Sequence, residues 1–268
     1  MSIRHQLGRL RQEILCAFGR RLVDLGDLGP IITFTFDDFP RSALTTGGAI
    51  IERFGGRATF YVSMGLMGTS NDLGEQFRFI DLTSAVERGH EVGTHSFSHL
   101  SARRTPTGKF LADVSHCEKA LRDALGVKSS GDFAYPYGEA SLSMKRKLGP
   151  RVGSSRGTCG GFNGPDVDLN LLRANKLCGG IDQAEAAKRL ILENERRRSW
   201  LIFYSHDVSS NPSRFGCTPA LLEAVVSFSA GRHVRMTTVA EVVAGMLCKK
   251  NNGFFSPPCR THDDGEPD

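Results

Sequence analysis

The 268-residue sequence lacks any apolar run that approaches the roughly 20 residues needed to cross a bilayer, so it predicts no transmembrane segment. It also lacks internal repeats and low-complexity tracts, which excludes fibrous and largely disordered proteins. Hydrophobic residues make up 40% of the chain and charged residues 24%. That balance predicts a folded protein with a sizeable core, in one large domain or two small ones.

Paired cysteines are missing as well, because the seven cysteines are scattered singly with no Cys-x-x-Cys spacing. We therefore expect reduced thiols rather than a complete disulfide framework or a cysteine zinc knuckle. The N-terminal segment has several arginines and no uninterrupted apolar region of the kind found in secretory signals. These features predict a cytoplasmic location.

The net charge of +5 is spread over the whole chain, and no lysine-rich patch interleaved with aromatic residues stands out. We therefore expect no nucleic-acid partner. Nothing in the sequence indicates an oligomeric state.

The pattern of apolar residues predicts three parts. Residues 1–29 place apolar side chains at steps of three and four among arginines, which indicates an amphipathic helix. This helix is expected to pack on the outside of the domain or, alternatively, to lie on an anionic membrane as a peripheral contact. Residues 30–248 form the folded domain. Residues 249–268 are polar and rich in Pro and Gly, so they are predicted to be a disordered tail.

Strand-like and helical patterns alternate through residues 30–248. The clearest strands are the uncharged, β-branched and aromatic runs at 31–36, 58–62 and 200–206. Weaker strand signals lie at 90–95, 133–137, 171–177 and 233–238. Repeated strand–helix units of this length predict parallel strands with helical crossovers, hence an α/β sheet or barrel.

Polar residues fall where several of these strands end. Asp37 and Asp38 follow the first strand, and His95, Tyr137 and His206 close three later ones. The carboxyl ends of barrel strands converge on one mouth. These residues are therefore expected to form one site.

A hydrolytic metal site needs about three protein ligands, typically His nitrogens and a carboxylate. His95 and His99 are spaced so that a helical turn would place both imidazoles on one side, although such a pair is more often two surface histidines. The adjacent acids Asp37 and Asp38 are costly to bring together unless a cation or a proton occupies the site. The alternative for these acids is an exposed turn or a helix cap.

Five segments resemble, in order and approximate spacing, the motifs of the polysaccharide deacetylases, which are carbohydrate esterase family 4 with its NodB homology domain. The segments are TFDDFP (35–40), THSFSH (94–99), FAYPYG (133–138), Arg-Gly at 156–157 followed by Gly-Gly-Phe-Asn, and LIFYSHD (201–207). The first, second and last are the specific ones. The resemblance covers roughly residues 30–245 and implies a distorted (β/α) barrel with fewer than eight regular strands.

The resemblance also implies a metal-dependent hydrolase that removes N-acetyl groups from an amino-sugar polysaccharide, oligosaccharide or glycan precursor. Asp38, His95 and His99 would bind the metal. A His₂Asp set suits Zn²⁺, which is the expected ion, and also Co²⁺ or Ni²⁺. Asp37 would be the general base and His206 the general acid.

Pro136, Tyr137 and Arg156 are expected on the substrate side of the site, where the backbone N–H of Tyr137 would stabilise the developing oxyanion. Many relatives carry an arginine that pairs with the base two residues before the proline of the third segment. This chain has Ala134 there. Arg156 is the candidate replacement, and Arg173 is the second candidate.

The acid that supports the catalytic histidine in many relatives is not visible either. Its candidate replacements are Asp207, Asp166 and Asp168. Other functions remain open: an O-acetyl esterase, a non-sugar amidase of the same fold, or a catalytically silent glycan-binding module. The ligand set does not separate the first two from an N-deacetylase, whereas a binding module would not need a base and an acid beside the metal. The sequence does not specify the glycan.

Overall fold

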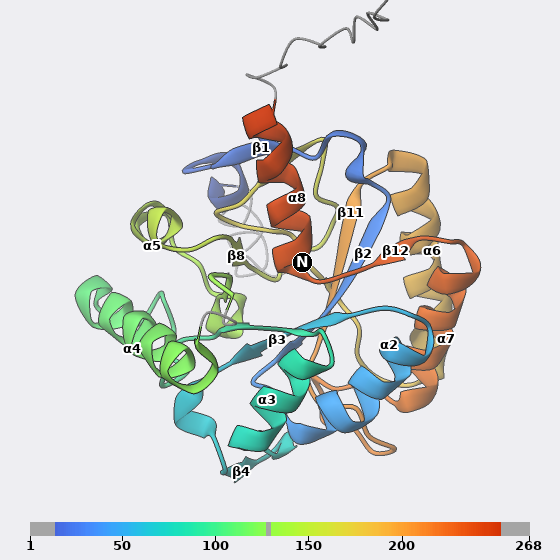
Figure 1. Ribbon diagram of the computed structural model, residues 1–268, viewed down its shortest axis with the longest axis horizontal. Coiled ribbons are helices and arrows are strands. Elements are labelled where there is room, and N and C mark those ends of the chain that lie inside the picture. Colours follow the sequence, from blue (N-terminus) through green and yellow to red (C-terminus); the bar gives the residue numbers. More distant parts are fainter. Residues whose placement is uncertain (1–13, 127–129, 253–268) are drawn as a thin grey trace, which may run out of the picture.

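The computed structural model describes residues 14–126 and 130–252. Its centre is a curled eight-stranded sheet in the order β10–β11–β2–β3–β6–β7–β8, with β12 as a further partner of β2 (Figure 1). The strands of this sheet are β2 (Ile31–Asp37), β3 (Ala58–Val62), β6 (Glu91–Thr94), β7 (Phe133–Ala134), β8 (Ser155–Arg156), β10 (Asn175–Lys176), β11 (Trp200–Ser205) and β12 (Arg235–Met236). Every pairing within it is parallel. The predicted distorted α/β barrel is confirmed.

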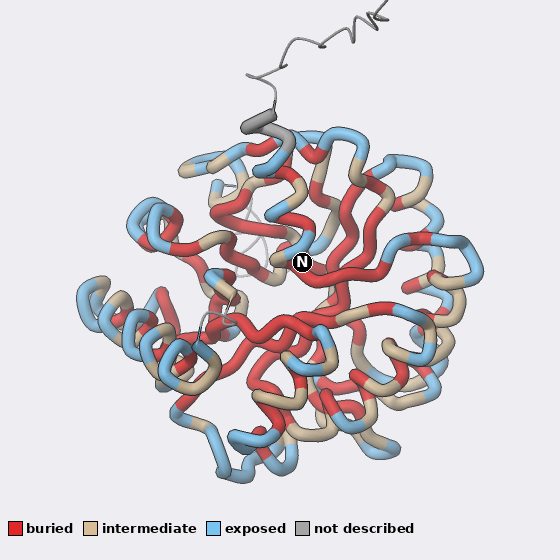
Figure 2. Tube along the Cα trace, viewed as in Figure 1, coloured by how far each residue is buried: buried red, intermediate tan, exposed pale blue. Residues whose placement is uncertain are grey.

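Helices surround the sheet, and Figure 2 shows buried residues along the central strands with exposed residues at the periphery. The helices are α2 (Ala49–Arg53), preceded by the π-helical turn Ala43–Gly48, α3 (Phe79–Glu87), α4 (Thr107–Leu125), α5 (Leu142–Leu148), α6 (Ala184–Arg197), α7 (Pro219–Gly231) and α8 (Val239–Asn252). Short 3₁₀ turns lie at Gly26–Leu28, Met64–Leu66, Pro136–Gly138, Gly149–Arg151 and Ile181–Gln183. Among the helices of the described residues, none has the length and hydropathy of a bilayer-spanning segment.

Strand β2 is the centre of the sheet. All seven of its residues are buried, as expected for an uncharged run covered on both faces. One edge pairs with β11 from Ile31 to Phe36. The other edge pairs first with β12 at Ile31 and Ile32 and then with β3 from Phe34 to Asp37. These registers bring the carboxyl ends of β2, β3 and β11 together.

The opposite ends of the strands, called the far edge below, hold a buried acidic pair: Glu91 begins β6, and Asp132 precedes β7. The two side chains share a hydrogen bond. Glu91 also accepts hydrogen bonds from Thr59 Oγ1 (2.8 Å), Ser130 Oγ (2.7 Å) and the backbone N–H of Ala240 (2.8 Å). Burial raises the pKa of Glu91 to about 8 and also raises the pKa of Asp132. Through Ala240, the pair attaches the first turn of α8 to the sheet.

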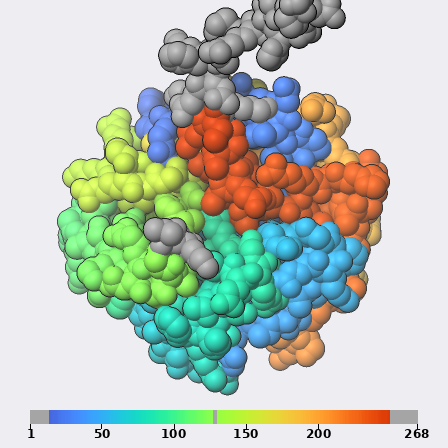
Figure 3. Space-filling model, in the orientation of Figure 1, coloured from blue at the N-terminus to red at the C-terminus, as the bar shows by residue number. Residues whose placement is uncertain are grey.

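Helix α8 crosses one face of the molecule, where Figure 3 shows its red atoms between the blue N-terminal segment and the cyan and blue helices. Its buried residues pack with Trp200 of β11 in one apolar cluster. Trp200 has no exposed surface and donates its indole N–H to Thr33 Oγ1 at 2.9 Å. Burying the indole with its N–H satisfied makes Trp200 a core residue.

The predicted N-terminal helix of residues 1–29 is only partly within the described residues. Residues 14–17 are helical, but Leu22–Asp24 forms strand β1, which pairs antiparallel with β9 (Asp166–Asp168). The helix prediction is therefore wrong at this end, because the backbone N–H and C=O groups pair with β9 instead of with their own helical turn. Residues 1–13 lie outside the description, and so does the membrane contact predicted for them.

Several expected boundaries also shift. The strand predicted at 133–137 ends at Ala134, because Pro136 begins a 3₁₀ turn. The strand predicted at 171–177 is reduced to β10. The predicted tail begins later than residue 249, because α8 continues to Asn252; residues 253–268 lie outside the description.

Candidate active site

The predicted site residues meet at the carboxyl ends of the parallel strands. Asp37 ends β2, and Asp38 follows it. His95 follows β6, and His206 follows β11. Residues up to 169 positions apart along the chain thus reach one mouth through parallel pairing, as expected of a barrel.

Asp38, His95 and His99 form the candidate metal site. Each offers one ligand atom, and the three atoms lie within 4.8 Å of one another. The distance from Asp38 Oδ1 to Nε2 is 3.3 Å for His99 and 3.9 Å for His95. Asp38 Oδ1 is buried and has no hydrogen-bond partner among the described residues. A buried carboxylate oxygen is costly without a partner, so this donor set fits a divalent cation.

A backbone contact orients His95 for this role. Its Nδ1 lies 2.8 Å from the carbonyl oxygen of Ala134 and therefore carries the proton in that hydrogen bond. The unprotonated Nε2 then faces Asp38 as a ligand. A carbonyl acceptor behind the ring is the usual way in which a ligating imidazole is held in one tautomer.

The backbone around the mouth is unusual because five non-glycine residues have positive φ. They are Asp38 (62°), Phe39 (59°), Ser96 (60°), His99 (51°) and Tyr137 (60°). Such conformations persist only where the surroundings enforce them. Phe39 supplies part of that constraint, because its ring has no exposed surface and stacks on Phe60 and Phe77.

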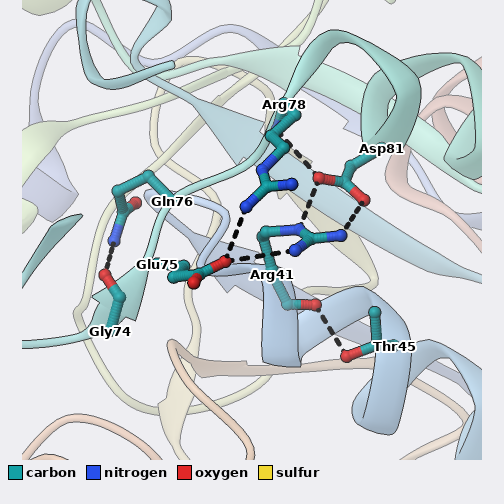
Figure 4. A network of polar contacts seen from close by, with 7 residues as sticks. All are labelled: Arg41, Thr45, Gly74, Glu75, Gln76, Arg78 and Asp81. Carbon is teal, nitrogen blue, oxygen red and sulfur yellow. Dashed lines mark hydrogen bonds and ion pairs between the residues drawn. The ribbon is translucent and has the colours of Figure 1, made fainter. Parts of the chain in front are cut away.

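A surface network supports the segment that follows Asp38 (Figure 4). Arg41 Nε donates to Asp81 Oδ2 at 2.9 Å, and Arg41 Nη1 donates to Glu75 Oε2 at 3.1 Å. Asp81 Oδ2 also accepts the backbone N–H of Arg78 at 2.8 Å, at the first turn of α3. Glu75 belongs to the hairpin of β4 (Ser70–Asn71) and β5 (Gly74–Glu75). The network therefore joins the segment after Asp38 to this hairpin and to α3.

Arg156 is the partner of Asp37. Its Nη2 lies 2.5 Å from Asp37 Oδ1 and 2.6 Å from Oδ2, and its Nη1 donates to the carbonyl of Gly157 at 2.9 Å. The guanidinium carbon lies 5.3 Å from the Tyr61 ring centroid and 5.4 Å from the Tyr204 ring centroid. The side chain that replaces the arginine missing at Ala134 thus comes from β8.

Arg156 has 0% exposed surface, so it cannot line the substrate side as expected. The correction follows from its place behind Asp37, where two aromatic rings cover it. The second candidate, Arg173, is directed elsewhere and donates to the carbonyl of Gly160 at 3.0 Å.

The two adjacent acids differ in their protonation. Burial tends to raise the pKa of Asp37, but the charge of Arg156 and its hydrogen bonds outweigh this effect and lower that pKa. Burial raises the pKa of Asp38 to about 6. Asp37 is therefore held ionised by a fixed cation, whereas Asp38 has no arginine of its own.

The two ligand histidines are held neutral. Burial lowers the pKa of His95 to about 3 and also lowers the pKa of His99. Neutral imidazole is the form that binds a metal. The protonation of the site thus agrees with its ligand geometry.

His206 lies across the mouth, half-buried beside Phe215, with ring centroids 5.4 Å apart. Its Nδ1 is buried and has no hydrogen-bond partner among the described residues.

None of the three acids expected to support His206 contacts that buried nitrogen. Asp207 instead accepts hydrogen bonds from the backbone N–H and the hydroxyl of Ser213 (2.8 and 2.5 Å), which closes its own loop. Asp166 and Asp168 belong to β9, where Asp168 pairs with Lys145 at 2.6 Å. The prediction that one of these acids supports His206 is wrong.

Pro136 and Tyr137 lie beside the candidate metal site, and their contact with substrate stays a prediction. Pro136 is buried, whereas Tyr137 is 65% exposed. The Tyr137 ring meets the His99 ring edge-on, with centroids 4.5 Å apart. Tyr137 is thus the exposed aromatic residue on the solvent side of His99.

Two features of the mouth could not be predicted from the sequence. Ser155–Arg156 forms strand β8 inside a Gly-rich stretch, and a two-residue strand has no periodicity of its own. Tyr61 covers Arg156 from the end of β3. An apolar-run pattern marks Tyr61 as a strand residue and cannot show that it stacks on a cation.

Comparison with known proteins agrees with the motifs. Residues 27–152 match the family model described as polysaccharide deacetylase. A peptidoglycan-N-acetylglucosamine deacetylase of Listeria monocytogenes is 28% identical over 119 residues. That match covers 44% of this chain and 24% of the relative, so the chain spans about a quarter of the length of this relative.

Solved structures share the fold. The chitin deacetylase of Colletotrichum lindemuthianum is 17% identical, with a TM-score of 0.58 over 84% of this chain and 91% of that chain. A family 4 acetyl xylan esterase from Clostridium thermocellum, solved in complex with a cobalt ion, is 18% identical, with a TM-score of 0.53 over 80% and 90% of the two chains. The match to the family model includes the first three of the five motifs, and over residues 27–152 this chain is similar in sequence to the polysaccharide deacetylase family.

Proposed function

We propose that this chain is a metal-dependent hydrolase that removes N-acetyl groups from an amino-sugar polysaccharide, oligosaccharide or glycan precursor. One observation supports the proposal above the others: a three-ligand cluster, Asp38, His95 and His99, lies beside a fourth buried group, Asp37, which its arginine keeps ionised. A binding site would need the ligands alone. An ionised carboxylate next to them supplies a base for hydrolysis.

Asp38, His95 and His99 would hold the cation, and Zn²⁺ is the expected ion, with Co²⁺ and Ni²⁺ as alternatives. A bound cation of this kind lowers the pKa of water and polarises an amide carbonyl. The chain's own contribution is to keep Nε2 of His95 unprotonated, through the hydrogen bond from its Nδ1 to Ala134.

Asp37 takes the proton of the attacking water in this proposal. Both oxygens of Asp37 accept hydrogen bonds from Nη2 of Arg156, and these charged hydrogen bonds hold the carboxylate in one orientation. The lowered pKa of Asp37 keeps it ready to accept a proton at neutral pH.

His206 donates a proton to the departing amine, which would otherwise leave as an unstable anion. Its position after β11 places it across the mouth from the His95 and His99 pair. The backbone N–H of Tyr137 is the proposed donor to the developing oxyanion, and the exposed Tyr137 ring is a surface on which a sugar ring can pack.

The deciding experiment measures acetate release from an oligomer of N-acetylglucosamine by the chain loaded with Zn²⁺ or Co²⁺, beside acetylated xylan as an O-acetyl substrate and N-acetylated peptide as a non-sugar amide. Release from the oligomer supports the proposal. Release only from xylan would make the chain an O-acetyl esterase, and release only from the peptide would make it an amidase. Oligomer binding without release from any substrate would make it a binding module.

A further inference from the structure

Two cysteines from distant parts of the chain meet away from the candidate active site. Cys16 lies in the helical segment 14–17, and Cys159 lies three residues after Arg156. Both pack in the apolar cluster around Phe133. Their side chains share a hydrogen bond. Both are thiols in this structure.

The segment that carries Cys16 is fastened to the domain by a buried lysine. Lys145 donates to the carbonyl oxygens of Leu15 (2.7 Å) and Phe18 (2.9 Å), and it pairs with Asp168 at 2.6 Å. Lys145 has no exposed surface. Lys145 therefore anchors the segment that carries Cys16 to the folded domain, and this anchor keeps Cys16 next to Cys159.

Solvent reaches the Cys16 side of this pair. Cys16 is half-buried and lines a cavity of about 160 Å³, whereas Cys159 is buried beneath it. The charged residues of that cavity are Arg20, Arg173, Asp166 and Asp168. A small reagent can thus approach Cys16 before Cys159.

The surroundings favour the thiolate of Cys16. The hydrogen bond from Cys159 is the largest influence and lowers the pKa of Cys16 to about 6, against the effect of burial. The charges of Arg173 and Lys145 lower it further, and the charge of Asp168 opposes them. Thiols that react with oxidants are typically ionised, accessible and next to a second cysteine.

We propose that Cys16 is a peroxide-reactive modification site and that Cys159 is its resolving partner, so that a hydroperoxide joins the two residues in a disulfide. The site is separate from the deacetylase chemistry and does not depend on the proposed function.

The chemistry balances with one hydroperoxide as the oxidant. The Cys16 thiolate attacks the terminal oxygen of hydrogen peroxide, an S–O bond forms, the O–O bond breaks, and the departing hydroxide takes a proton to become water. The Cys159 thiol then loses its proton and attacks the sulfenic sulfur, an S–S bond forms, and the S–O bond breaks with loss of a second water. Two thiols are oxidised, and one peroxide is reduced to two waters.

The chain carries a matched control in Cys178 and Cys217, where the charge of Cys178 contributes to raising the pKa of Cys217. Burial raises the pKa of Cys178 to about 11 and the pKa of Cys217 to about 12. Cys178 donates its S–H to the carbonyl of Phe215 at 2.7 Å. This second pair should stay reduced where the first reacts.

The first test treats the reduced full-length chain with hydrogen peroxide and maps the products by mass spectrometry under non-reducing conditions. We expect the intact mass to fall by two hydrogens, with one peptide that links residue 16 to residue 159. In Cys159→Ala the reaction should stop at a sulfenic acid on Cys16 that dimedone traps. Links that join other cysteines instead, or oxidation of the Cys178 and Cys217 pair first, would overturn the proposal.

The second test measures iodoacetamide alkylation of Cys16 against pH in the unmodified chain and in Cys159→Ala. The half-maximal rate should lie near pH 6 in the unmodified chain and move to higher pH in the variant, because the main stabilising hydrogen bond is lost. At pH 7 Cys16 should react about threefold to tenfold faster than an ordinary exposed thiol, the gain in ionised fraction being partly offset by weaker nucleophilicity. If the alkylation rate of Cys16 depended on pH as that of the exposed Cys248 does, the proposal would be contradicted.

Discussion

Two pairs of buried carboxyl groups lie at opposite ends of the strands of the same sheet, and their pKa values shift differently. At the mouth, Asp37 and Asp38 are neighbours along the chain, yet the pKa of Asp37 is lowered and that of Asp38 is raised. At the far edge, Glu91 and Asp132 share a hydrogen bond, and both pKa values are raised.

The difference lies in the partners rather than in burial. Arg156 places a full positive charge on both oxygens of Asp37. Glu91 has neutral donors, the hydroxyls of Thr59 and Ser130 and one backbone N–H. Neutral donors satisfy hydrogen bonds without offsetting the cost of a buried charge. The mouth therefore keeps one acid ionised for chemistry, and the far edge holds a proton for structure.

The largest effect should come from substituting the two acids at the mouth one at a time. We expect Asp37→Asn to retain bound Zn²⁺ and lose about 10²-fold or more in kcat, because the ligands remain while the base is gone. Asp38→Ala, His95→Ala and His99→Ala should each lose the metal. Metal content and turnover of each purified variant test this, with the exposed Asp72→Asn as the control. Stoichiometric metal in all three ligand variants would refute the assignment of ligands.

Removing the positive charge of Arg156 should bring the pKa values of Asp37 and Asp38 closer together. Arg156→Ala is expected to keep metal and lower kcat/KM by about tenfold or more, the scale of losing a charged contact that orients the base. Without Arg156 the pKa of Asp37 rises, so the acidic limb of the kcat/KM profile should move to higher pH. The exposed Arg151→Ala is the control. An unshifted profile at full activity would mean that the ion pair does not act on the reaction.

Neutralising one acid at the far edge should change how stability depends on pH. The pKa of Glu91 is about 8 in the folded chain, above the ordinary value of 4.5, so its contribution is fully present below pH 4.5 and is lost as the pH rises through 8. Glu91→Gln keeps the hydrogen-bonding shape without ionising. We expect it to gain on the order of 2 kcal/mol relative to the unmodified chain between pH 5 and 9.

Urea unfolding at several pH values measures this difference. Glu87→Gln, at an exposed residue, serves as the control, and its unfolding free energy should depend on pH as that of the unmodified chain does. If the unfolding free energy of Glu91→Gln showed that same pH dependence, the pair Glu91 and Asp132 would not hold a proton at neutral pH.

The smallest effect is expected at the surface network that supports the mouth. Arg41→Ala leaves Asp81, which is 8% exposed at its side chain, without its main cation. We expect a small loss in unfolding free energy, because solvent screens an ion pair whose arginine is partly exposed. Thermal unfolding checks this against Arg78→Ala, whose side chain is 57% exposed and should matter less. Equal losses of stability in Arg41→Ala and Arg78→Ala would show that the ion pair with the buried Asp81 contributes no more than an exposed one.

The long buried strands could be predicted from the sequence because apolar runs such as 31–36 and 200–206 need no partner to be recognised. Asp37, Asp38 and His206 could be located because they follow those runs. The candidate ligands His95 and His99 were predicted from their spacing and from the THSFSH motif. Arg156 was found as the partner of Asp37 from its motif alone, although its burial was not. The pairing of β1 with β9 was missed, because three-residue strands are stabilised by their neighbours rather than by a pattern of their own.

The left-handed backbone at Asp38 and His99 was also missed. Such conformations are usual for glycine and are sparsely populated by other residues. At these positions the packed surroundings override the local preference, and the sequence does not encode that directly. The environment of His206 was also not predicted. Asp207 accepts hydrogen bonds from Ser213 in its own loop, and the sequence does not show that contact.

The central place of β2 has a consequence for how the protein is made. β2 is the first strand of the central sheet to leave the ribosome, while its partner β11 and the His206 that follows it are among the last segments synthesised. Closing so long a loop is entropically costly and slows folding. The edge of β2 that pairs with β11 therefore stays unpaired through most of translation. A protein cut short before residue 200 would have the candidate ligands Asp38, His95 and His99 but would lack β11 and His206 at the mouth.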